Sequence, residues 1–362
     1  FAVLASHSYL ADEHSLAQAI SAASDHRQQL LDWFWELSDS ECYFVLAVCL
    51  FGNLPRSEFW RWYERAVAEA WRTHDPLLRI IPGLNAALRR YVGEELRLDP
   101  TDRQLILAEA VTCYPRPLVW ALPLVQETVN ESAASNTEVA RETRAVLAQV
   151  VGEVANRETA AALPTLRAWA VHRAEPVRLA AAHAISVAIQ GQQGGGSNAM
   201  LSLLEDWARD QAVEAGWVPP RYAHRVPWTV AWALGKAVWS LSEIQVEEIL
   251  PLFWDLARNP DPRVRQALAS ALGSAGPQNL IPLAGLIGYL AADASKRVRS
   301  RLALSLATLA AAYEATILDL VRAWAEAEDG QRRWTALAAL ILMGRDSHRA
   351  ADSLVALAAR AP

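Results

Sequence analysis

A short pattern of valine, arginine and small apolar residues recurs along the second half of the chain and constrains its fold more than any other feature. The copy beginning at Val264 is VRQALASALG, and related copies begin 34 residues later at Val298 (VRSRLALSLA) and 34 residues further at Arg332 (RRWTALAALI). Two earlier copies begin at Val177 (VRLAAAHAIS) and Val226 (VPWTVAWALG). A period of 34 residues over the last three copies indicates an array of stacked structural units.

An apolar segment of helical spacing precedes each copy. These segments occupy residues 163–173, 200–210, 249–259, 280–291 and 315–327. The turns that follow often place an acidic residue beside proline or glycine, as in Asp261-Pro262, where the acid can cap the next helix and proline fits its first turn. One helix pair cannot bury its apolar stripe alone, so successive pairs must stack. Since no strand alternation is found, the chain is predicted to be all-α.

The turn, the Val-Arg pair and the Ala/Leu spacing together resemble HEAT repeats, and among them the bacterial HEAT-like repeats typified by the phycobilisome-lyase group. The resemblance covers about 163–350. It implies a right-handed α-solenoid of helix pairs and a non-catalytic scaffold or recognition module that binds another protein or peptide.

The arginine of the repeated pattern raises a separate question. It is present in four of the five copies, and Pro227 replaces it in the fifth. Near a helix N-terminus a cation is unfavourable to the macrodipole, so something must compensate for it. The resemblance implies pairing with the aspartate of a neighbouring repeat's turn. We therefore predict a structural ladder made of Arg178, Asp261, Arg265, Arg299 and Arg333.

Two domains are predicted. Residues 161–362 form the repeat array, with a long loop at 191–199 (GQQGGGSNA) and an insertion at 215–228 stretched by Pro219-Pro220. Residues 1–160 form a helical N-terminal region, either of irregular helical repeats or like a winged-helix linker. Within it, Ser38 and Glu41 have the spacing of a capping box.

Residues 30–75 carry a second resemblance. The stretch CYFVLAVCLFGNLPRSEFW and the aromatic helix that continues it resemble the helical linker region that follows the nucleotide-binding domain of STAND-type signalling NTPases. This resemblance implies that the array is the sensor arm of a larger signalling or defence protein. Since the chain begins with Phe1, we also expect it to be part of a longer polypeptide.

Charge and cysteine content bound the partners and the compartment. The first 161 residues hold 14 arginines against 22 acidic residues, and the remainder holds 20 Arg and Lys against 18, for a net charge of −6. This balance argues against a strongly basic face, and so against nucleic acid. The arginine-rich, alanine-rich composition is typical of GC-rich bacteria. Three cysteines without metal spacing predict reduced, buried thiols in a cytoplasmic protein.

Motifs that carry known chemistry are missing from the sequence. It contains no phosphate-binding GxxxxGK[ST], no HExxH, no CxxC and no GxSxG. His172 and His183, without a third ligand, are a weak metal signal. We therefore predict no enzyme activity, no cofactor and no metal. No apolar run reaches the roughly 18–20 residues of a membrane span, so no membrane is expected.

Fifteen tryptophans are unusual for a chain of this length. Most are expected to fill the core, but Trp228 and Trp232 share one face of a helix beside the 215–228 insertion. This face predicts a groove that binds a partner. The candidate residues are Trp217, Arg221, Tyr222, His224, Arg225, Trp228 and Trp232.

An enzymatic alternative uses the same region. HEAT-like DNA glycosylases place Trp, Arg and Asp on a concave face, and the matching residues would be Trp228, Trp232, Arg265 and Asp261. That alternative requires a positive surface for DNA.

Overall fold

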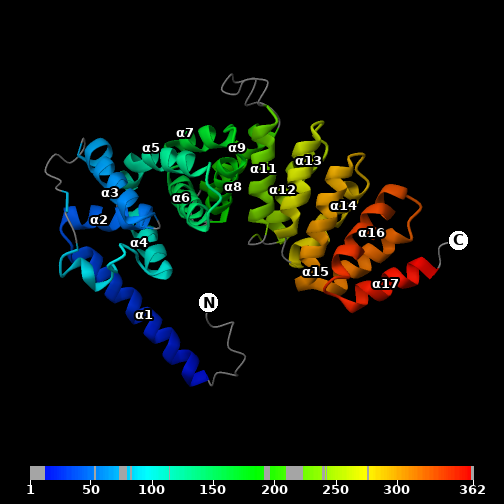
Figure 1. Ribbon diagram of the computed structural model, residues 1–362, viewed down its shortest axis with the longest axis horizontal. Coiled ribbons are helices and arrows are strands. Elements are labelled where there is room, and N and C mark those ends of the chain that lie inside the picture. The colour runs from blue at the N-terminus through cyan, green and yellow to red at the C-terminus, as the bar shows by residue number, and fades with distance from the viewer. Residues whose placement is uncertain are drawn as a thin grey trace. The chain divides into compact units, whose positions relative to one another are not determined.

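The structure is a computed structural model of the 362-residue chain. It describes residues 13–359 except 53, 73–79, 82–83, 114, 191–195, 209–222, 239–240, 242 and 275–276. The chain forms two compact units, Phe1–Val125 and Gln126–Pro362. Within the described residues both units consist of helices and loops without any strand, which confirms the all-α prediction (Figure 1).

The first unit is built from helices and the irregular segments that connect them. Its elements are α1 (Glu13–Glu36), α2 (Asp39–Phe51), α3 (Arg56–Arg65), the π-helix η2 (Ala66–Trp71), the 3-10 helix η3 (Leu88–Arg90), α4 (Pro100–Cys113) and the start of α5 (Pro115–Ser132). Helix α2 begins where predicted, because the Glu41 carboxylate accepts hydrogen bonds from the Ser38 N–H at 2.9 Å and the Ser38 O–H at 2.6 Å.

Aromatic side chains fill the core of the first unit. Phe44 meets the edge of Tyr63 at 5.2 Å between ring centroids, and Phe51 stacks on Trp62 at 6.0 Å. The indole N–H of the buried Trp71 donates to the Pro117 carbonyl at 2.9 Å. The uninterrupted apolar run of α2 is therefore explained by burial on several sides rather than by a membrane.

The cysteines partly match their prediction. Cys42 and Cys49 are buried and free, and burial raises the pKa of each thiol to about 12, so both are protonated at neutral pH. Cys113 also has a reduced thiol, but it is exposed at the end of α4, so the prediction that all three thiols are buried is wrong.

The second unit contains the helix pairs. After α6 (Glu138–Arg157), the first helices of the pairs are α7 (Thr159–Ala170), α9 (Gly196–Ala208), α12 (Glu243–Ala257) and α14 (Pro277–Ala291). The second helices are α8 (Glu175–Gln190), α11 (Arg225–Ala237), α13 (Pro262–Ala271, extended by the 3-10 helix η5, Leu272–Ser274) and the first part of α15 (Lys296–Ala325). The end of α15 pairs with α16 (Gly330–Met343), and α17 (His348–Ala359) follows.

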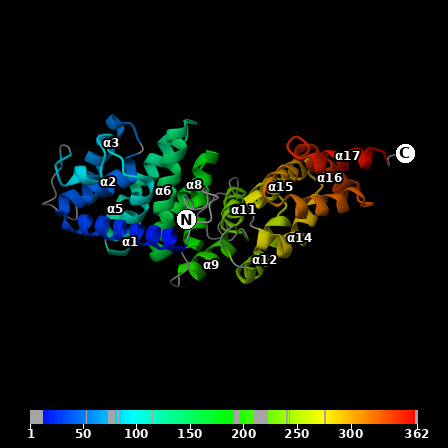
Figure 2. The same ribbon diagram turned by 90° about the horizontal axis from the view of Figure 1, so that it is seen from below.

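These pairs stack in two layers. In one layer α6 packs on the second helices, which follow in the order α8, α11, α13, α15 and α16. In the other layer the first helices α9, α12 and α14 pack on one another in that order. Figures 1 and 2 show successive pairs side by side from green to red. Successive packing of helix pairs is the arrangement of an α-solenoid, as predicted; its right-handedness stays a prediction.

Small residues set the spacing of the second helices. A Cβ added at Gly235 of α11 would lie 2.1 Å from the Cβ of Ala271 on α13, and one added at Gly152 of α6 would lie 2.5 Å from the Ala184 carbonyl of α8. Glycine is therefore required at these contacts, because any side chain would push the helices apart.

Helix α15 joins two repeats without a loop. Its only non-helical backbone angles are at Tyr313 (φ −133°, ψ 47°), where the second helix of one pair runs into the first helix of the next. By length and composition α15 could cross a membrane, contrary to the expectation that no apolar run is long enough. In this fold, however, α15 packs against α13, α14 and α16 and is bent at Tyr313.

Three boundaries differ from the sequence predictions. The second compact unit begins at Gln126, and α6 packs on α8, so helical stacking starts before residue 161. Helix α9 begins at Gly196, so residues 196–199 of the predicted loop are helical; 191–195 lie outside the described residues. Likewise, the last residues of the predicted 215–228 insertion form the first turn of α11.

Candidate functional site

A groove of about 720 Å³ crosses four consecutive second helices, α8, α11, α13 and α15. We call it the arginine groove. Its lining comprises Arg173, Glu175, Arg178, Leu179, His224, Arg225, Trp228, Trp232, Arg263, Gln266, Ala267, Ser270, Gly273, Ser274, Arg301, Leu304, Ser305 and Thr308. Its volume lies within the roughly 300–1,000 Å³ of ordinary ligand sites.

The charge of the arginine groove is strongly positive. Five arginines line it, against a single carboxylate, that of Glu175. An adjoining hollow shares Gln266 and Arg301 with it and adds Lys296 and Arg297. Burial lowers the pKa of His224, with a smaller contribution from the neighbouring Arg263, so this imidazole is neutral at pH 7. The expectation that the fold lacks a basic face is therefore wrong for this part of the array.

The arginines reach the groove from the beginnings of the second helices. Arg225 is the first residue of α11, Arg263 the second residue of α13, and Arg301 lies in the second turn of α15. Arg225 Nη1 donates to the Val171 carbonyl at 2.8 Å and Arg263 pairs with Asp261, whereas Arg301 is exposed and forms no ion pair among the described residues. The positive charge that remains favours a site that attracts an anion.

Two tryptophans form the floor next to these cations. The rings of Trp228 and Trp232 lie 6.0 Å apart and are tilted by 53°. The guanidinium of Arg178 lies over the Trp228 ring, 4.6 Å from its centroid. The buried indole N–H of Trp232 has no hydrogen-bond partner among the described residues.

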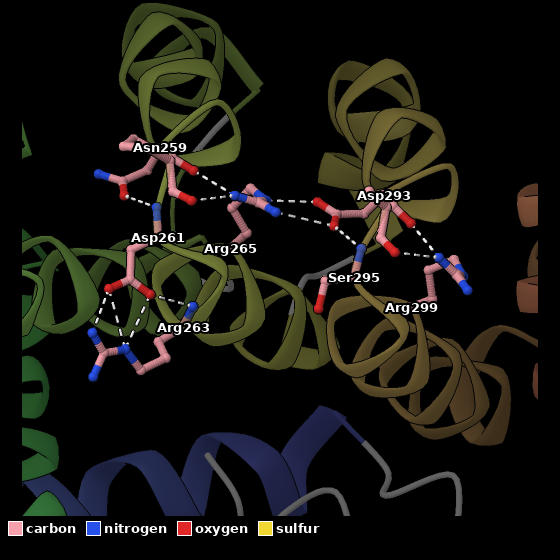
Figure 3. A network of polar contacts seen from close by, with 9 residues as sticks. Asn259, Asp261, Arg263, Arg265, Asp293, Ser295 and Arg299 are labelled. Carbon is pink, nitrogen blue, oxygen red and sulfur yellow. Dashed lines mark hydrogen bonds and ion pairs between the residues drawn. The ribbon is translucent and has the colours of Figure 1, made fainter.

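The arginines of the repeated pattern share one local contact. Arg265 Nη1 donates to the carbonyls of Asn259 (2.6 Å) and Pro260 (3.1 Å), six and five residues before it. Arg178 and Arg299 bind the two equivalent carbonyls of their own turns, and Arg333 binds that of Ala327. Each arginine therefore closes the turn between the two helices of its own pair, as Figure 3 shows for Arg265 and Arg299.

Three of these arginines also contact the next pair. Arg265 forms a two-pronged ion pair with Asp293 in the following turn, at 2.7 and 3.2 Å, with the side chains only 16% and 4% exposed (Figure 3). Arg178 lies over Trp228 of α11, and Arg299 lies 5.2 Å from the ring centroid of Trp334 on α16. The link between pairs is an ion pair in one case and a cation–π contact in two.

Asp261 takes a different part from the one predicted for it. Its carboxylate caps α13 by accepting from the Arg263 N–H at 2.8 Å and forms an ion pair with the Arg263 side chain at 2.7 Å. The preceding pair has Pro227 where the other pairs have arginine, so that pair offers no arginine of the repeated pattern to Asp261. The aspartate of the inter-repeat ion pair is instead Asp293.

Comparison with known families agrees with this geometry. A family model described as HEAT repeats matches residues 225–307, which run from the start of α11 into α15. The protein contains HEAT repeats. A search of curated proteins finds no match. HEAT repeats typically mediate protein–protein interaction and are generally not enzymes.

The HEAT repeats gather some of the residues predicted for partner binding. His224, Arg225, Trp228 and Trp232 all line the arginine groove. Trp217, Arg221 and Tyr222 lie outside the described residues. Sequence reasoning missed the groove residues Arg173, Arg263 and Arg301, because exposed arginines are not marked by the apolar periodicity that locates a helix.

The HEAT repeats do not assemble the residues proposed for a glycosylase. Arg265 and Asp261 are absent from the groove lining and are engaged with Asp293 and Arg263, respectively.

The described residues contain no cluster of three or more potential metal ligands. His172 lies in the turn after α7 and accepts a hydrogen bond from the Ala174 N–H, whereas His183 lies two to three turns into α8.

Proposed function

We propose that this HEAT-repeat protein is a non-catalytic recognition module that binds another protein through the arginine groove. The observation that carries the proposal is an open groove across four successive helices whose cations include Arg173 and Arg301, exposed side chains that form no ion pair among the described residues. Functional surfaces of solenoids are typically extended and built from several repeats. The composition supports a cytoplasmic, bacterial setting.

A charge-reversal experiment tests this proposal. The variant carries Arg173→Glu and Arg301→Glu, and the control carries Arg141→Glu and Arg345→Glu, two exposed arginines outside the groove lining. Both variants change the net charge equally. We expect a protein captured from the source organism by wild type and control to be lost with the groove variant. The captured protein, once purified, must also bind the wild type directly with a defined stoichiometry.

The opposite result has a clear meaning. If the groove variant captures and directly binds the same partner as the control does, recognition uses another surface and the proposal fails.

A second proposal follows from residues 30–75 and from the separate first unit. There the repeat array serves as the sensor arm of a larger STAND-type signalling protein. The discriminating observation is the genomic reading frame upstream of Phe1. A nucleotide-binding domain encoded there supports this proposal, and an unrelated sequence rejects it.

A further inference from the structure

We propose that the occupant of the arginine groove is an extended acidic segment of the partner protein, with carboxylates about three residues apart. This inference rests on the proposed function and adds the chemistry of the partner.

The first argument is electrostatic. The groove and the adjoining hollow bring together seven cationic side chains and one carboxylate, although the whole chain has a net charge of −6. Arg263 is neutralised by Asp261, but Arg173, Arg297 and Arg301 have no ion pair among the described residues. Like charges that are held together repel, and a bound anion relieves that repulsion.

The second argument concerns spacing. The cations lie on consecutive helices, with Arg178 on α8, Arg225 on α11, Arg263 on α13 and Arg301 on α15. The first three also bind groups of the chain itself: Arg178 binds turn carbonyls, Arg225 the Val171 carbonyl and Arg263 the Asp261 carboxylate. Packed neighbouring helices have axes about 8–10 Å apart. An extended peptide advances about 3.3 Å per residue, so one helix step corresponds to about three residues. Three helix steps therefore match a segment of about ten residues with acidic side chains at positions one, four, seven and ten.

The third argument distinguishes a peptide from a nucleic acid. Bases bind by stacking on open aromatic faces, but Arg178 already covers Trp228, and the two tryptophans are tilted rather than parallel. The groove also offers apolar surface among its lining residues, from Leu179 and the 47% exposed Leu304. Alternating cationic and apolar contacts suit a segment whose acidic residues alternate with apolar ones.

Arginine is also the cation best fitted to this task. A guanidinium presents parallel N–H donors that bind both oxygens of a carboxylate. The protein itself uses this geometry between Arg265 and Asp293.

The test uses fluorescence anisotropy with labelled ten-residue peptides and the full chain. One peptide carries glutamate at positions one, four, seven and ten with leucine and serine between, and a second carries the same residues with its glutamates adjacent. We expect the spaced peptide to bind about tenfold more tightly. Arg173→Ala with Arg301→Ala should weaken that binding about tenfold, while Arg141→Ala with Arg345→Ala should change it less than twofold.

Other outcomes overturn the proposal. Absence of saturable binding by the spaced peptide, or equal binding of both peptides with equal sensitivity to both variants, shows that the groove does not recognise a spaced acidic segment. Tighter binding of a nine-nucleotide oligothymidylate than of the spaced peptide assigns the groove to nucleic acid instead. If a partner protein depends on Arg173 and Arg301 but is not displaced by the spaced peptide, the proposed function stands and only this inference fails.

Discussion

The arginine of each repeated pattern resolves an electrostatic conflict within a single turn. It lies near the N-terminus of a second helix, where its charge opposes the helix dipole. The carbonyls that it binds, such as those of Asn259 and Pro260 for Arg265, follow the C-terminus of the preceding helix α12. The C-terminal end of a helix carries unsatisfied carbonyls and a negative potential. The preceding helix therefore stabilises the arginine, and this offsets the unfavourable dipole of the helix on which the arginine lies.

Removing either partner of the ion pair between repeats should destabilise the array. Arg265→Ala or Asp293→Ala leaves a largely buried charge without its partner, and we expect a loss of about 1–3 kcal/mol in the free energy of unfolding. Urea denaturation measures it. Arg263→Ala, which removes a 59% exposed partner of Asp261, should cost less than about 1 kcal/mol. Equal losses for Arg263→Ala and Arg265→Ala would contradict the inter-repeat role of Arg265.

His183 should make stability depend on pH. Burial, with a contribution from Lys236, lowers its pKa from 6.5 to about 4. The unfolded chain therefore binds a proton that the folded chain does not, so stability is fully present above pH 6.5 and falls as the pH drops towards 4.

The loss through His183 should approach about 3 kcal/mol at most. Chemical denaturation of wild type and His183→Gln between pH 7 and 4 measures it, and the difference between the two curves isolates this group from other residues that titrate in the same range. Parallel curves for the two proteins would rule out the shifted pKa.

For single residues, the sequence predicted the positions of the repeated arginines better than it predicted the residues with which they pair. Arginine at Arg178, Arg265, Arg299 and Arg333 was visible because the pattern repeats. Asp293 was not, because its turn, AADASK, has no acidic residue directly before proline or glycine, unlike the turns at Glu175-Pro176, Asp261-Pro262 and Asp329-Gly330. The exposed groove cations were missed because solvent-facing positions of a helix carry no apolar periodicity.

Successive helix pairs are held together by close contacts between the second helices of the pairs. The side chain that is absent at Gly235 allows α11 to approach α13, and Ser305 of α15 donates to the Ala269 carbonyl of α13 at 2.7 Å. Short distances between helices increase the buried contact area without large side chains.

Gly235→Ala should therefore destabilise the stack although alanine favours helices. Its Cβ would lie 2.1 Å from that of Ala271, and we expect a loss of about 1–3 kcal/mol or more, seen as a lower Tm. Gly330→Ala is the matched control, because a Cβ there meets nothing within 4 Å. That change should be neutral or slightly stabilising. An unchanged Tm for Gly235→Ala would show that α11 and α13 separate easily.

Helix pairs were the most predictable elements. All five predicted first helices and their partners are present, since strong 3.6-residue periodicity fixes where a helix exists. Their limits were less predictable. The loop between two pairs is missing at Tyr313, where a single change of backbone angles replaces it, and no glycine or proline marks that position.

The whole chain comprises two units, each with its own core. Units of this kind are expected to unfold in separate cooperative steps. Differential scanning calorimetry should resolve two transitions, and Arg265→Ala should lower the temperature of one while moving the other by less than about 1 °C. A single transition that shifts as a whole would show that the units fold as one.

Net charge was a poor guide at this scale. A sum of −6 over 362 residues says nothing about where the arginines gather, and they gather on consecutive second helices. Folding places residues more than a hundred positions apart, such as Arg173 and Arg301, on one surface. This surface forms only when the helix pairs stack, so its charge could not be located from the net charge of the chain.

Because the groove cations lie on four successive helices, the distances between them are set by the curvature of the stack. A ligand that contacts all four helices therefore favours the solenoid curvature at which the spacing of the cations matches the spacing of its own charges. By reciprocity, any force that straightens the stack weakens binding by the same free energy. The affinity for the ligand and the stiffness of the helix stack are therefore coupled through the same free energy.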